Sequence, residues 1–156
     1  MKLSPFTLSE CEQFYRSRHI SMTRYQILQS YMVIGGIPFY MNYFNPSLSL
    51  AQNIDKLFFA QKEQKLIRET DFWEHHLNEV QIKSWCGIAF EEVCFNHIEQ
   101  IKKALGIAGV STTETAYIAK GDAETAGMRI DMLINRRDDV IKLCELKYYE
   151  NRLSID

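Results

Sequence analysis

The spacing of apolar residues changes along the chain, from repeats of three and four residues to alternation. The repeats are most regular between Ser84 and Gly106, where they are typical of a helix, and Gly106 lies where a left-handed cap is expected. After Gly106, short apolar runs alternate with polar residues, as in strands with one covered face. The pattern predicts an α+β chain in which one helix near 87–105 packs on a three-stranded antiparallel sheet.

The first sixty residues contain recognisable helix starts and stops. Thr7 and Glu10 have the spacing of a capping box, Thr23 is placed to cap a second helix, and Gly35-Gly36 is typical of a helix end. Helices are therefore predicted near residues 7–18, 23–34 and 49–60. Aromatic residues at helical spacing usually form a core, although such a cluster also suits a docking face. We expect four of them to be buried together: Tyr31, Phe39, Tyr40 and Phe58.

A polar stretch separates this helical part from the rest of the chain. Residues 61–83 are expected to form an exposed helix or a linker. His75 and His76 lie within it, but adjacent residues do not share a helix face, so no joint metal site is expected there. The predicted organisation has three parts: a helical segment at 1–60, the polar stretch at 61–83 and an α+β domain at 84–156.

Two apolar runs flank the charged tetrad 136–139, and this pattern predicts a β-hairpin. A turn centred near Asp138 places Asp131 opposite Glu145, because both are seven residues from it. Opposed residues have Cβ atoms about 4.5–5.5 Å apart. Lys147 lies two residues beyond Glu145 and so shares its face.

Two carboxylates this close need positive charge between them, and the sequence offers two sources. A divalent metal such as Mg²⁺ is one, since it is often held by one or two carboxylates. An ion-paired surface hairpin is the other, with Lys147 and Arg129 neutralising the acids. The spacing alone leaves both interpretations open.

The same residues carry a resemblance to a known superfamily. Ile130-Asp131 followed by Glu145-Leu146-Lys147 resembles the signature of the PD-(D/E)XK nucleases. The wider stretch from Trp85 to Tyr148 is similar to the C-terminal nuclease-like domain of archaeal-type AAA-family ATPases of prokaryotes. The resemblance implies a Mg²⁺-dependent hydrolase acting on DNA phosphodiesters. Asp131 and Glu145 would hold the metal, Lys147 would orient the nucleophile or stabilise charge, and Glu91 would assist water or a second metal.

The helical segment resembles another part of the same ATPases. Residues 35–40, Gly-Gly-Ile-Pro-Phe-Tyr, are similar to their helical lid, but the G-x-x-x-x-G-K-[ST] phosphate loop is absent from the sequence, so we expect no ATP binding. Relative to the family pattern, the ATPase core, the middle winged-helix segment and the C-terminal end are missing, and Arg129 replaces a polar amide. These departures favour an alternative function, a non-catalytic remnant or interaction module with an ATPase partner or self-association. Activity in this truncated nuclease-like domain is therefore not expected.

Composition indicates the cellular compartment of the protein but does not identify its reaction. The net charge of −2 gives no overall basic excess for nucleic-acid binding, although DNA remains the implied substrate. The four cysteines form no CxxC motif and are expected to be reduced, as in a cytoplasmic protein. We expect no membrane association, because no apolar run approaches the length of a membrane span.

Overall fold

The computed structural model describes residues 4–58, 79–121 and 126–149. It divides into two compact units, Met1–Ala89 and Phe90–Asp156, which are described separately below. The adjacent imidazoles of His75 and His76 lie outside the described residues. Within the described part of the chain, no helix has both the length and the apolar character needed to cross a membrane.

The first unit is helical, and its first two helices begin where their capping residues predict. Thr7 and Thr23 each accept a hydrogen bond from the backbone three residues later, and each closes a full capping box. Gly35 ends the second helix in the left-handed conformation, with φ of +67°. Proline at the first turn of the third helix lacks only an N–H that would have no helical partner. The helices are α1 (Leu8–Ser17), α2 (Arg24–Ile34), α3 (Pro38–Met41) and α4 (Leu50–Phe58).

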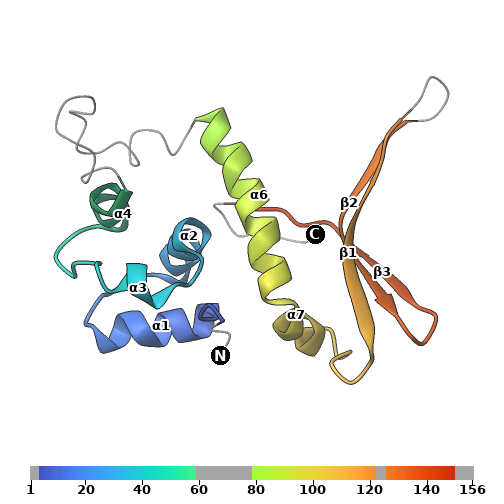
Figure 1. Cartoon of the computed structure of the whole chain (residues 1–156), viewed down its shortest axis with the longest axis horizontal. Coiled ribbons are helices and arrows are strands. Elements are labelled where there is room, and N and C mark those ends of the chain that lie inside the picture. Colours follow the sequence, from blue (N-terminus) through green and yellow to red (C-terminus); the bar gives the residue numbers. More distant parts are fainter. Residues whose placement is uncertain (1–3, 59–78, 122–125, 150–156) are drawn as a thin grey trace, which may run out of the picture. The chain divides into compact units, whose positions relative to one another are not determined.

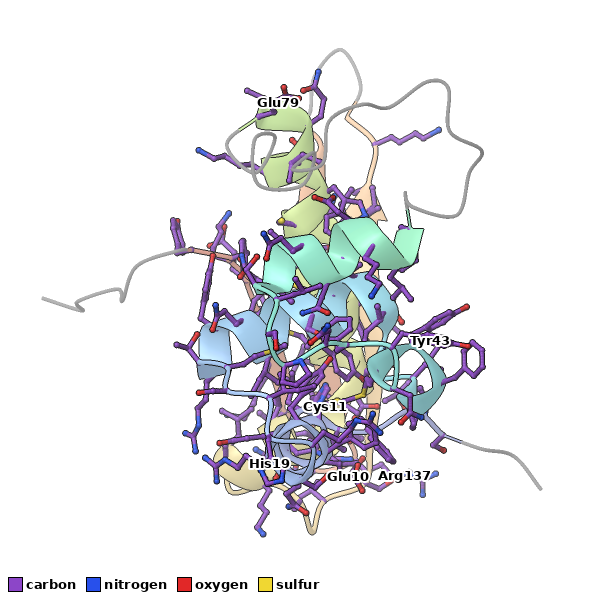
Figure 2. All side chains as sticks on the ribbon, turned by 90° about the vertical axis from the view of Figure 1, so that its left-hand side faces the viewer. Glu10, Cys11, His19, Tyr43, Glu79 and Arg137 are labelled. Atoms are coloured by element: carbon purple, nitrogen blue, oxygen red, sulfur yellow. The ribbon has the colours of Figure 1, made fainter. Side chains whose placement is uncertain are left out.

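The core of this unit differs from the predicted aromatic cluster. Tyr31 is buried, but Phe39 and Phe58 are 61% and 41% exposed, and Tyr40 is exposed as well. The unexpected helix α3 is only one turn long, so it turns a single side chain, Met41, fully inward. The aromatic side chains beside Met41 therefore remain at the surface, as Tyr43 does in Figure 2.

Buried side chains in the first unit come instead from all four helices and from Phe44, which follows α3. Tyr15 is almost fully buried, and its hydroxyl lies 2.5 Å from the hydroxyl of Ser30. Its ring stacks on Phe44, with the centroids 5.5 Å apart. A buried tyrosine of this kind contributes apolar area while its polar end keeps a partner.

The long helix predicted near 87–105 is broken in two. Helix α6 (Val80–Asn96) ends before His97, and α7 (Ile98–Ala104) follows it (Figure 1). The ring Nδ1 of buried His97 lies 2.8 Å from the Val93 carbonyl, which also accepts the His97 backbone N–H. This side-chain hydrogen bond competes for a helix carbonyl and accompanies the local departure from helical geometry. Gly106 ends α7 with φ of +70°, as predicted.

The three strands form the predicted antiparallel sheet, in the order β1–β2–β3. They are β1 (Thr112–Ala119), β2 (Met128–Arg136) and β3 (Ile141–Cys144) (Figure 1). Met132 pairs with Cys144 and Leu133 with Leu143, which is the register of a turn centred at residue 138. Met132 and Ile134 are fully buried and pack with residues of α6 and α7: Phe90, Cys94, Phe95, Ile98 and Ile101.

Candidate functional site

One open pocket of about 500 Å³ lies where β2 meets the chain after β3. Three of the four site residues predicted from the sequence line it, namely Asp131, Glu145 and Lys147. Glu91, on α6, joins them through a contact with a fourth lining residue, Arg129. The other lining residues are Ile130, Leu143 and Cys144.

Strand parity explains why Asp131 faces this pocket. Met132 and Ile134 point into the core, so Asp131 points to the opposite face of β2. Regular pairing of β2 with β3 stops at Cys144, one pair before the predicted partners Asp131 and Glu145. Beyond Cys144, the Asp131 carboxylate binds the chain that follows β3: its Oδ2 accepts a hydrogen bond of 2.9 Å from the backbone N–H of Leu146.

Arg129 connects the helix to the strand. Its Nη2 donates to both carboxylate oxygens of Glu91 at 2.6 Å, and its Nε lies 3.3 Å from Oδ1 of Asp131. The side chains of Glu91 and Asp131 are 25% and 14% exposed, so both acids are largely shielded from water. One guanidinium therefore neutralises two carboxylates that belong to different elements.

Glu145 and Lys147 form the second ion pair of the pocket. The ammonium nitrogen lies 2.6 Å from the Glu145 carboxylate, and both side chains are more than half exposed. The hydrogen bond with Glu145, and then its negative charge, raise the pKa of Lys147, with smaller contributions from Tyr149 and Asp131. Lys147 is therefore a cation at neutral pH, suited to stabilising negative charge rather than accepting a proton.

These contacts can be compared with the two interpretations of the hairpin, a metal site and an ion-paired surface. The ion pairs expected of Arg129 and Lys147 are present. Over residues 4–58, 79–121 and 126–149, no cluster of three or more His, Cys, Asp or Glu side chains has an arrangement suited to a metal ion. Asp131 and Glu145 nevertheless supply two carboxylates at the pocket, and Mg²⁺ in proteins is often held by one or two carboxylates.

The sequence pointed to the charged side chains of the site but not to its backbone donor. The backbone N–H of Leu146, which donates to Asp131, could not be predicted, because the identity of a side chain does not show what its backbone amide binds. The contact of Arg129 Nη2 with both Glu91 oxygens spans 38 positions, beyond any local pattern.

Comparisons with protein-family models, curated proteins and solved structures give no match for this chain. Function is therefore inferred from the geometry of the pocket and from the residues that line it.

Proposed function

We propose that residues 84–156 belong to a PD-(D/E)XK nuclease-like module with a site for one divalent cation and for DNA phosphodiesters. The observation that carries this proposal is the meeting of Asp131, Glu145 and Lys147 in one open pocket. Two carboxylates and a lysine cation are the groups that metal-dependent phosphodiester hydrolysis requires. In this proposal residues 1–60 are the lid-like segment of an AAA-type ATPase, without ATP binding of their own.

The proposed roles follow from the contacts of each residue. Asp131 and Glu145 would hold Mg²⁺ or Mn²⁺, and the bound ion would screen the phosphate and activate water. The Leu146 N–H fixes the Asp131 carboxylate at the pocket, so that less ordering is needed when a ligand arrives. Lys147, cationic at neutral pH, would stabilise negative charge that develops on the phosphate.

A second candidate function is a non-catalytic interaction module of such an ATPase. Arg129 favours it, because this side chain already neutralises Glu91 and Asp131 without any metal. In that case the charged pocket is a structural ion-pair network, and neither metal nor DNA binds there.

Metal-dependent stabilisation separates the two candidates. The melting temperature of the purified 156-residue chain is measured with and without Mg²⁺ or Mn²⁺, together with Asp131→Asn and Glu145→Gln. A ligand that binds only the folded state adds about 2.7 kcal/mol at a hundred times its Kd. The nuclease-like function predicts a rise that both variants lose.

Asp138→Asn is the matched control, because Asp138 is an ion-paired carboxylate in the hairpin turn outside the pocket. It should keep the metal-dependent rise. Absence of any rise in the unmodified chain would exclude the metal site and favour the interaction module. Cleavage of DNA that Glu145→Gln abolishes would establish the nuclease activity itself.

A further inference from the structure

Besides Lys147, the pocket is lined by a second cationic side chain, Arg129. The position of Arg129 is relevant to how many metal ions the site accepts. Resting on the proposed function, we propose that Arg129 is a positioning residue that takes the place of a second metal ion. It occupies the Glu91 carboxylate and so limits the site to one divalent cation, carried by Asp131 and Glu145.

The contacts of Arg129 differ from those of an ordinary surface pair. Its guanidinium binds Glu91 through both carboxylate oxygens and also approaches Asp131, so a single cation joins helix α6 to strand β2. The other arginine pair on β2 joins Arg136 to Asp138, two residues away in the adjoining turn. Of these two arginines, Arg129 lines the candidate site and Arg136 does not.

Charge explains why Arg129 controls metal binding. A divalent ion on Asp131 would be repelled by a guanidinium whose Nε lies 3.3 Å from that carboxylate. The same guanidinium occupies both oxygens of Glu91, which are the donors a second ion would need. Without Arg129, Glu91 and Asp131 become two shielded acids with no shared cation, and a metal ion becomes the neutralising charge.

Calorimetric titration of the full chain with Mn²⁺ tests this role. The unmodified chain is expected to bind one ion, and Arg129→Gln is expected to bind the first ion about tenfold more tightly and to accept a second. Arg129→Gln combined with Glu91→Gln should lose the second ion only. Arg136→Gln removes the same charge from the same strand and should leave affinity and stoichiometry unchanged.

A melting curve without metal checks folding and supplies a readout independent of activity. Arg129→Gln should melt below Arg136→Gln, and Mn²⁺ should restore its stability. If Arg129→Gln does not fold, Arg129→Lys keeps the charge but replaces the separate Nη2 contact with Glu91 and Nε contact with Asp131 by a single ammonium nitrogen. It should show a smaller gain in affinity, of a few-fold.

The outcomes distinguish this inference from the function on which it rests. If the unmodified chain binds one Mn²⁺ ion and neither Arg129 variant changes affinity or stoichiometry, the role of Arg129 is wrong and the metal site stands. If neither the unmodified chain nor the Arg129 variants bind Mn²⁺, both proposals fail.

Discussion

Asp131 offers a test that separates its structural contact from its charge. Its Oδ2 accepts the Leu146 N–H at 2.9 Å, and Oδ1 lies 3.3 Å from Arg129. A hydrogen bond to a charged group contributes about 1.5–3 kcal/mol, and an ion pair whose cation is about half exposed, as Arg129 is, adds about 1 kcal/mol. Asp131→Ala removes both, so we expect it to destabilise this junction by about 2–3 kcal/mol.

Asp131→Asn is the matched variant. The amide oxygen still accepts the Leu146 N–H, so only the charge is lost, at about 1 kcal/mol. The difference between the two variants, about 1–2 kcal/mol, isolates the hydrogen bond from the charge.

Native-state hydrogen exchange at the Leu146 amide reads this contact directly. Because about 1.4 kcal/mol corresponds to a factor of ten, Asp131→Ala should speed exchange of that amide by roughly 30-fold or more. Asp131→Asn should change it by less than about tenfold. Equal exchange rates in the unmodified chain and Asp131→Ala would refute the reasoning, since the carboxylate would then not protect the amide.

Three further predictions concern the two cores and a buried thiol. Gly36→Ala should destabilise the first unit far more than Gly35→Ala in urea titrations. Both positions have positive φ, which costs alanine about 1–2 kcal/mol of stability. At Gly36, but not at Gly35, the new Cβ would also lie 2.5 Å from a backbone oxygen. Met132→Ala should cost about 2–5 kcal/mol because the side chain is fully buried, whereas Leu143→Ala, at a position 65% exposed, should change stability by less than about 0.5 kcal/mol in the same assay. Burial raises the pKa of the Cys94 thiol to about 11, so at pH 8 only about a thousandth of it is thiolate. Its alkylation, followed by mass spectrometry, should therefore be slow at pH 8 and speed up towards pH 11; rapid labelling at pH 8 in the folded chain would contradict the burial.

Local chemistry determined much of the fold, and the sequence predicted those parts. The capping box at Thr7, the cap at Thr23 and the left-handed stop at Gly106 depend on residues within one turn of each other. The hairpin register follows from alternation about a short turn, which is why the pairing of Met132 with Cys144 agrees with the prediction. Asp131 and Glu145 both line one pocket, although the regular pairing ends one pair before them.

Other features depended on contacts between distant segments. Periodicity cannot show that the helix is interrupted at His97, whose ring lies against the Val93 carbonyl, because the apolar spacing continues unchanged on both sides. Nor can it show that Phe39 stays exposed, since burial depends on which side of a one-turn helix meets the core. The partners of Asp131 were decided in the same way. Arg129 reaches Glu91 across 38 positions, and the end of the strand ladder frees a backbone N–H for the carboxylate; both result from packing that brings α6, β2 and the end of β3 together.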